Sequence, residues 1–238
     1  MTRRRWIADE ITGDRAAITG EHARHLAQAL RAQVGQEFDI STGAEVRRGR
    51  IATIRPERVE FELGEAVMQS DQPDITVAIS IFKFDRMEWA IEKCTELGVV
   101  RIVPVIAERT EKHLVAAATK RAERWRRIAN QASEQSRRLS APEISEPIKF
   151  KELAAVTGET RIVLSETEQK LMLKDAIPRQ SHSVLLAFGP EGGWKQQELA
   201  ALREHGWLSA SLGSTVLRAE TAVIASVAIT GSILKGSE

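Results

Sequence analysis

Hydrophobic and polar residues alternate in two different rhythms along the chain, and the rhythm changes after residue 67. Up to that point, short alternating runs are separated by turn signals, and the run at 58–63 is the clearest of them. This spacing predicts short β-strands, with one capped helix over 19–30 that carries its apolar residues on one side. Because short strands can satisfy their edges by closing on themselves, we expect a small β-barrel over residues 1–67.

The polar segment 68–74 contains a proline and interrupts the pattern on both sides, which is typical of an interdomain linker. Beyond it, apolar runs alternate with helical patterns, so we expect an α/β domain with a mostly parallel sheet over residues 75–238. Pro104 predicts an irregularity or an edge in its strand, since proline cannot donate to a sheet ladder. The expected strands are 75–82, 101–106, 160–164 and 207–212, and the expected helices are 85–97, 114–138, 150–156, 197–204 and 220–234.

Two glycine-containing loops follow short apolar runs in the last quarter of the chain. The first reads Gly-Pro-Glu-Gly-Gly over 189–193, and the second begins with Leu-Gly at 212–213. Both stand where a strand gives way to a helix, which predicts a ligand crevice at the carboxyl edge of an open sheet. Glu191 lies among the glycines and would repel a phosphate, so we expect a nucleotide-like ligand without a polyphosphate.

Composition excludes several classes of protein. The 238 residues are 42% hydrophobic and 28% charged, with a formal net charge of +1, so a nucleic-acid surface must be a local patch. Cys94 is the single cysteine, which excludes a disulfide framework and a cysteine-built metal site. His22 and His25 have no third ligand placed beside them, so no metal is expected. Without a signal peptide or a long apolar run, we expect a cytoplasmic protein.

Arginine clusters offer candidate contacts to RNA phosphates. Residues 1–67 contain eleven arginines and eleven acids, and the arginines either grip phosphates or cover solvated strand faces. The helix at 114–138 has a local excess of positive charge, with the same two interpretations. Lys83 and Arg86 follow the first strand of the α/β domain, on the expected ligand side. The candidates are Arg3, Arg4, Arg5, Arg47, Arg48, Lys83, Arg86, Arg124, Arg127 and Arg138.

The glycine loops also carry a family resemblance. Gly-Pro-Glu-Gly-Gly at 189–193 and Val-Leu-Arg-Ala-Glu-Thr-Ala at 216–222 resemble the cofactor loops of the SPOUT methyltransferases, and most closely the family that methylates N3 of a uridine in 16S ribosomal RNA. Further matches lie upstream, in order and at plausible spacing, so that the likeness spans about residues 75–235. They are 85–89, 92–98, 102–104, 108–109, 134–137 and 142–144.

This resemblance implies a PUA-like RNA-binding barrel, a SPOUT domain with a deep trefoil knot, a homodimer, and methylation of uracil 1498 in the usual 16S numbering. S-adenosylmethionine would be the cofactor, held by loops at 164–168, 189–194 and 212–222. The implied cofactor-binding residues are Leu164, Ser165, Glu166, Gly189, Pro190, Glu191, Gly192, Leu212, Gly213, Ser214, Leu217, Arg218, Ala219, Thr221 and Ala222.

The N3 imide of uridine is largely protonated at neutral pH. Methylation therefore requires either a base that accepts the proton or a group that stabilises the developing negative charge. Arg137, Arg218 and Arg86 are candidates to stabilise the developing negative charge. Glu191 and Glu220 are candidates to accept the proton, or else they accept hydrogen bonds from backbone amides. Arg137, Arg218 and Glu220 are therefore the expected catalytic residues.

Two other functions stay open at this point. One is methylation of a different RNA position, such as a ribose 2′-hydroxyl, on the same fold. The other is an RNA-binding module without catalysis, although both glycine loops are intact. A nicotinamide dehydrogenase is disfavoured, because no dinucleotide fingerprint follows a predicted strand.

Overall fold

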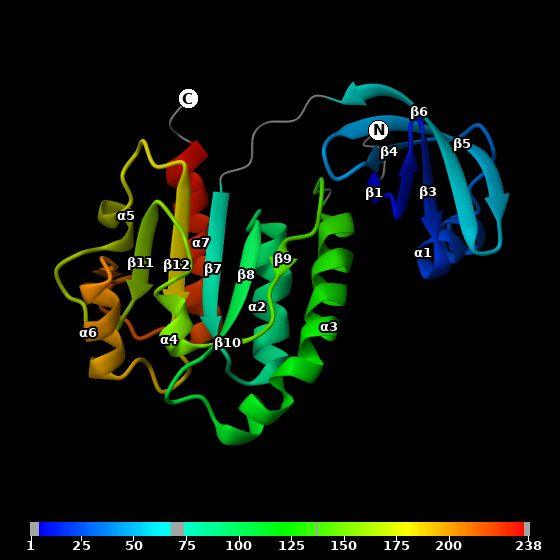
Figure 1. Cartoon of the computed structure of the whole chain (residues 1–238). Helices are drawn as coiled ribbons and strands as arrows, with labels where there is room; N and C mark the ends of the chain where they lie inside the picture. Colours follow the sequence, from blue (N-terminus) through cyan, green and yellow to red (C-terminus); the bar gives the residue numbers. More distant parts are fainter. Residues whose placement is uncertain (1–4, 68–73, 137, 236–238) are drawn as a thin grey trace. The chain divides into compact units, whose positions relative to one another are not determined.

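The computed structural model describes residues 5–67, 74–136 and 138–235, with the side chain of residue 235 left out (Figure 1). These residues divide into two compact units. The N-terminal unit comprises 5–67 together with 133–141 apart from 137, and the C-terminal unit comprises 74–132 and 142–235. The long helix α3 (Lys112–Gln135) therefore begins in one unit and ends in the other.

The N-terminal unit is built on a six-stranded sheet in the order β1-β4-β5-β6-β3-β2. All neighbouring pairs are antiparallel except β1 with β4. The two edge strands, β1 and β2, follow each other in the chain, so the sheet curls until its edges come close. In the connection between them, the Ala8 N–H donates to the Ser41 carbonyl and the Asp9 N–H donates to the Ala17 carbonyl. The strands are β1 (Arg5–Ile7), β2 (Glu10–Thr12), β3 (Arg15–Thr19), β4 (Glu37–Ser41), β5 (Val46–Arg55) and β6 (Arg58–Val67).

Apolar side chains on the inner face of this sheet form its core. Phe38 and Phe61 pack edge to face, with ring centroids 6.3 Å apart, next to the fully buried Ile40. Gly49 is required here, because a Cβ on it would collide with the Ile40 side chain. The alternation at 58–63 thus gives the inward face that the sequence predicts, with Val59, Phe61 and Leu63 buried.

The predicted helix over 19–30 is present but not as a regular, capped α-helix. It consists of α1 (Gly20–Arg24) followed by a π-helical turn, η1 (His25–Ala29). Thr19 takes the N-cap position, yet its hydroxyl donates to the Asp9 carboxylate and makes no capping bond. The prediction of a cap at Thr19 was wrong, because the hydroxyl is directed toward the Asp9 carboxylate and accepts no N–H from the first turn.

The C-terminal unit contains a seven-stranded, fully parallel sheet in the order β10-β8-β7-β12-β11-β13, with β9 also paired to β8. The α/β class expected from the alternating pattern is confirmed. Its strands are β7 (Asp74–Ser80), β8 (Arg101–Ile106), β9 (Glu143–Ile144), β10 (Ile148–Lys149), β11 (Thr160–Leu164), β12 (Ser183–Phe188) and β13 (Leu208–Ala210).

Helices cover both faces of this sheet (Figure 1). Side chains such as Val77 and Leu186 point to the face covered by α2, α3, α5 and α7, whereas Ala78 and Leu185 point to the face covered by α4 and α6. This two-sided burial explains why the strands are continuous apolar runs. Besides α3, the helices are α2 (Phe84–Glu96), α4 (Phe150–Leu153), α5 (Leu173–Ala176), α6 (Gln196–Glu204) and α7 (Ala219–Lys235).

Pro104 marks an irregularity inside the sheet, as its lack of an N–H predicts. On one side, β8 pairs continuously with β7. On the other side, its neighbour is broken in two: β9 ends opposite Ile102 and β10 begins opposite Val105, so Pro104 lies at the gap.

Candidate functional site

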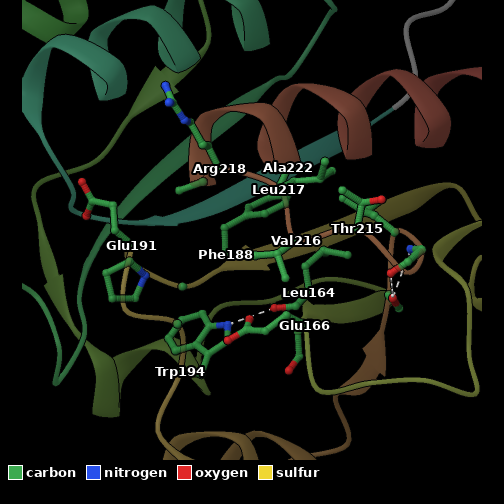
Figure 2. Close-up of a pocket in the computed structure, with 18 of the residues that line it drawn as sticks. Leu164, Glu166, Phe188, Glu191, Trp194, Thr215, Val216, Leu217, Arg218 and Ala222 are labelled. Carbon is green, nitrogen blue, oxygen red and sulfur yellow. Dashed lines mark hydrogen bonds between the residues drawn. The ribbon is translucent and has the colours of Figure 1, made fainter.

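A pocket of about 370 Å³ opens at the carboxyl edge of the parallel sheet (Figure 2). Three loops line it: 164–166 after β11, 188–194 after β12, and 211–219 after β13. Arg86 on α2 and Ala222 on α7 complete the lining. The chain passes from β7 to β8 on one side and returns through β11 and β12 on the other, so the pocket lies beside the reversal of strand order, where open α/β sheets bind ligands.

Two glutamates that follow β11, Glu166 and Glu168, have different surroundings. Glu168 accepts hydrogen bonds from the backbone N–H groups of Lys170 at 2.8 Å and Leu171 at 3.3 Å. Those amide donors, that of Lys170 foremost, hold the pKa of the Glu168 carboxyl below its usual value. Glu166 is exposed and lines the pocket, which leaves its carboxylate available to a ligand.

The second loop is fastened to the first by a tryptophan. The Nε1–H of Trp194 donates to the Leu164 carbonyl at 3.1 Å (Figure 2), and the ring is buried against Phe150. Gly193 adopts a φ of 67°, and a Cβ there would collide with the Glu166 carboxylate. Glycine is favoured at this position because an L side chain is strained in that backbone conformation, and a Cβ would also displace the Glu166 side chain.

Two further contacts hold the outer side of the second loop. The Glu191 carboxylate accepts a hydrogen bond from the Lys83 backbone N–H at 3.2 Å, just after β7. From the turn after β8, the Arg109 guanidinium donates to the Gly192 carbonyl, and its aliphatic stem lies against the Gly192 Cα. The loop is therefore positioned from the ends of three strands before any ligand binds.

The third loop supplies most of the apolar surface. Val216 is 79% exposed, although it points among Leu164, Phe188 and Leu217 in the pocket (Figure 2). The Ser211 hydroxyl accepts from the Gly213 N–H at 3.1 Å and thereby fixes the start of the loop. An apolar side chain that is exposed inside a pocket is the kind of surface that a flat apolar ligand covers.

Charged groups stand at the rim of the pocket. Arg218 is exposed and lines the pocket, and Arg86 faces the Glu220 carboxylate, with Nε and Oε1 3.7 Å apart. Glu220 is only 5% exposed, and its other oxygen has no hydrogen-bond partner within the described residues. Because that oxygen is inaccessible, Glu220 is placed to orient Arg86 rather than to face a ligand.

The pocket brings together most of the residues expected to bind a cofactor. Gly192 is excluded because it faces Arg109, and Thr221 because it projects from the exposed side of α7. The expected residues that line the pocket are Leu164, Ser165, Glu166, Gly189, Pro190, Glu191, Leu212, Gly213, Ser214, Leu217, Arg218, Ala219 and Ala222.

Besides Arg86, six lining residues were not named individually as cofactor contacts. Four of them lie within the expected loops 189–194 and 212–222, namely Gly193, Trp194, Thr215 and Val216. Phe188 and Ser211 lie just before those loops and were missed. Extending each expected loop back to the last residues of its strand would have found both.

The three expected catalytic residues do not lie together. Arg218 lies at the pocket, Glu220 is buried behind Arg86, and Arg137 lies outside the described residues. The pattern of small and charged residues at 216–222 could not reveal that Glu220 turns inward, because this depends on the packing of α7 against α2.

The expected RNA contacts also separate into groups. Arg3 and Arg4 lie outside the described residues, Arg5 is partly buried in β1, and Arg86 is at the pocket. Arg48, Lys83 and Arg127 have exposed side chains, as contact with a phosphate backbone requires.

Three of the expected RNA contacts are engaged by the protein itself. Arg47 binds the Asp14 carboxylate at 2.8 Å and the Gly64 carbonyl at 2.8 Å. Arg124 forms a two-pronged pair with Glu88, with N–O distances of 2.7 and 2.8 Å. These two guanidiniums are thus bound by neighbours that the sequence alone does not bring close.

The third, Arg138, is the clearest departure from the expectation. Its side chain is only 6% exposed, and its Nε–H donates to the Ser140 carbonyl at 3.2 Å. Burial lowers the pKa of the guanidinium to about 10, because removing a cation from water disfavours its charged form. An RNA phosphate cannot reach a side chain held in this way without a rearrangement.

Two kinds of feature are absent from the described residues. They contain no cluster of three or more histidine, cysteine, aspartate or glutamate side chains arranged to hold a metal ion. No described helix combines the length and the apolar character that crossing a membrane demands.

Comparisons with known proteins agree with one another. Residues 68–231 match the family described as RNA methyltransferase domain. The chain is 31% identical to the ribosomal RNA small subunit methyltransferase E of Synechocystis, over 95% of this chain and 76% of that protein. It is 28% identical to the protein of the same name from Bacillus subtilis, over 93% of each.

Solved structures give the same picture. The crystal structure of a ribosomal RNA small subunit methyltransferase E from Neisseria gonorrhoeae, bound to S-adenosyl methionine, has a TM-score of 0.86 at 28% identity and covers 98% of both chains. A putative methyltransferase from Legionella pneumophila, in complex with the same cofactor, has a TM-score of 0.83 at 27% identity, over 100% of this chain and 98% of the other. The chain belongs to the RNA methyltransferase family, among the ribosomal RNA small subunit methyltransferase E proteins.

Proposed function

We propose that this protein transfers a methyl group from S-adenosylmethionine to N3 of a uridine in the 16S RNA of the small ribosomal subunit. The observation that carries the proposal is the three-loop pocket at the carboxyl edge of the parallel sheet, in a chain of this family. The relatives from Neisseria gonorrhoeae and Legionella pneumophila, whose structures contain the cofactor, support the same assignment.

The residues of the pocket fit that cofactor. A volume of about 370 Å³ lies in the range of small-molecule sites. Leu164, Phe188, Val216 and Leu217 offer an apolar wall for a purine ring. Glu166 suits hydroxyl groups or a cation, whereas it would repel a phosphate, and S-adenosylmethionine is a cationic nucleoside without phosphates.

When bound, S-adenosylmethionine supplies an electrophilic methyl group on its sulfonium. The work of the chain is then to place the uridine N3 in line with that methyl group and to stabilise the negative charge that develops as the imide proton leaves. Arg218 and Arg86 border the pocket and are assigned this stabilising role. Glu191, exposed at the rim, is the better-placed proton acceptor, since the free oxygen of Glu220 is inaccessible.

The proposal extends to features that the family resemblance implies. The N-terminal unit would be a PUA-like RNA-binding domain, and the C-terminal unit would contain a deep trefoil knot. The position of α7 supports the knot: it follows the edge strand β13, yet it packs against β7 and β12 in the middle of the sheet. A homodimer and a cytoplasmic location belong to the same proposal, as do RNA contacts by Arg48, Lys83 and Arg127.

Titration calorimetry tests the cofactor. We expect the protein to bind S-adenosylmethionine but not NAD, and Val216→Trp to weaken binding at least tenfold by filling the pocket. Val34→Trp is the matched control, because Val34 is a similarly exposed valine, at 64%, in the N-terminal unit. If Val216→Trp bound the cofactor as tightly as the wild type, the pocket would not be its site.

Methylation of 16S RNA tests the substrate. Incubation with labelled S-adenosylmethionine, followed by digestion to nucleosides, is expected to give 3-methyluridine. A 2′-O-methylated nucleoside would show that the same fold acts on the ribose. Cofactor binding without methyl transfer to either free 16S RNA or the small subunit would favour an RNA-binding module that lacks catalysis.

A further inference from the structure

One arginine in the N-terminal unit adopts a backbone conformation that glycine normally provides. Arg31 has a φ of 51°, and it is the sole non-glycine residue with a positive φ in the described parts of the chain. L-residues pay a steric cost in this left-handed region. A strained residue of this kind persists only where the surrounding structure enforces it or where its side chain is needed.

The strain follows from how the preceding helical turn ends. The preceding turn is π-helical with Leu30 as its C-cap, and Ala32 donates its N–H to the Leu26 carbonyl at 3.1 Å, one residue further back than in the Schellman end of an α-helix. Arg31 therefore occupies the position where helices usually place glycine. Leu26, Leu30 and Ala32 all pack in the core of the unit, so Arg31 has no freedom to relax.

The side chain of Arg31 gains nothing from its own unit that would offset this strain. It is exposed, and it makes no hydrogen bond or ion pair with any described residue. Residues 31–36 contain no acid. A cation near a helix carboxyl end is mildly favourable, but a lysine or arginine in the last turn supplies that without strain.

The surroundings of Arg31 suit a nucleic acid. Val34, in the same loop, is 64% exposed, and the Arg50 guanidinium lies over Gly35, 3.5 Å from where a Cβ would stand. Glu37 and Glu62 stand opposite Arg50 in the sheet, so its charge is partly balanced, whereas that of Arg31 is not. A guanidinium without a nearby acid in the sequence and an exposed apolar side chain, both carried by one short loop, match a phosphate and a neighbouring ribose or base.

We infer that Arg31, presented by the 31–36 loop, binds a backbone phosphate of the RNA substrate. This inference rests on the proposed function, because the family supplies RNA as the partner. It adds a contact that neither the arginine clusters in the sequence nor the pocket identifies. The arginine is retained at a glycine position because its guanidinium is used by the substrate, at a cost to the stability of the free protein.

Two variants separate function from strain. Arg31→Gly removes both the guanidinium and the strain, so we expect the melting temperature of the N-terminal unit to rise by about 2–4 °C. RNA affinity should fall roughly fivefold, and the slope of log Kd against log salt should decrease by roughly 0.7–0.9. Arg31→Lys keeps the charge and the strain, so its melting temperature should equal that of the wild type and most of the affinity should remain.

The probe is 16S RNA transcribed in vitro, titrated by filter binding at several salt concentrations. Arg15→Ala is the matched control, an exposed arginine of the same unit with an ordinary φ, and it should change neither readout. Unchanged affinity and salt slope in Arg31→Gly would overturn the inference, even if the wild type methylates the RNA. A lower melting temperature would overturn it too, by showing that the side chain stabilises the fold.

Discussion

At the scale of single residues, two glutamates in the first pocket loop show how neighbours decide a role. Glu166 and Glu168 are two positions apart and chemically identical, and both lie in the expected cofactor loop at 164–168. The Glu168 carboxylate stabilises the loop, because two backbone N–H groups donate to it, whereas Glu166 lines the pocket. Glu168 therefore links the conformation of the loop to pH.

The sign of that pH dependence follows from the direction of the shift. The pKa of Glu168 is lower in the folded protein than its ordinary value of 4.5, so the unfolded chain binds the proton more tightly. Its contribution to the free energy of unfolding is present above pH 4.5 and is lost as the pH falls through the folded pKa.

We therefore expect Glu168→Gln to have a slightly lower melting temperature than the wild type at pH 7, with the difference disappearing in acid. Thermal unfolding followed by circular dichroism from pH 7 to pH 3 measures this. Glu166→Gln is the control, because no backbone amide of the described residues donates to that carboxylate. A difference for Glu168→Gln that grew toward low pH would contradict the assignment.

At the scale of elements, the glycine loop at 189–194 is positioned by its neighbours more than by its own residues. Trp194 anchors it to β11, Glu191 to the end of β7, and Arg109 to the end of β8. The buried Glu198 adds a further link, because its carboxylate accepts from the N–H groups of both Glu108 and Lys195. Such a loop loses little conformational freedom when a ligand binds.

Arg109 is the link that can be removed with least damage, because it is exposed and outside both cores. Arg109→Ala should weaken S-adenosylmethionine binding by about 1 kcal/mol, roughly fivefold, because the free loop becomes less ordered. The melting temperature should change little. Calorimetry and thermal unfolding of the same samples measure the two effects.

The controls for Arg109 distinguish positioning from charge. Arg109→Lys retains a donor for the Gly192 carbonyl and should recover part of the affinity, whereas Arg127→Ala, an exposed arginine on α3, should leave cofactor binding unchanged. If Arg109→Ala and Arg127→Ala weakened cofactor binding equally, the effect would be a general electrostatic one, and Arg109 would have no positioning role.

At the scale of the whole molecule, apolar side chains are left uncovered on two adjacent helices. Trp89 on α2 is 47% exposed, and Ile224, Ile229 and Ile233 on α7 are only partly buried. The two helices pack against each other, so their open sides can form one continuous surface. An exposed tryptophan in such a setting is typical of a subunit interface, which supports the homodimer within the proposed function.

Replacing that tryptophan tests the dimer. We expect the wild type to sediment at about twice the chain mass of 26.4 kDa, and Trp89→Glu to raise the dimer dissociation constant at least tenfold, or about 1.4 kcal/mol. Leu208→Glu, at a similarly exposed apolar position of 45% on β13, is the matched control and should remain associated. A monomeric wild type at micromolar concentration would rule out the dimer.

Local patterns in the sequence were enough to identify the regular elements and the approximate position of the pocket. Continuous apolar runs specify buried parallel strands because helices cover both faces of the sheet, and parallel strands bring their carboxyl ends to one edge. The loops after β11, β12 and β13 therefore had to converge. The short elements β2, β9, β10 and α5 were missed, since three or four residues carry no periodic signal and owe their structure to the strands beside them.

Only the tertiary structure decided which charged and polar side chains are free to contact a ligand and which are bound within the protein. Arg124 and Arg138 belong to a strongly cationic segment, yet one is bound by Glu88, thirty-six residues away, and the other is buried. Trp194 and Leu164 meet across thirty residues, and Glu220 turns inward beneath Arg86. Periodicity reports which face of an element is apolar, because burial repeats along the chain. A single ion pair or hydrogen bond between distant elements does not repeat, so only the folded chain can reveal it.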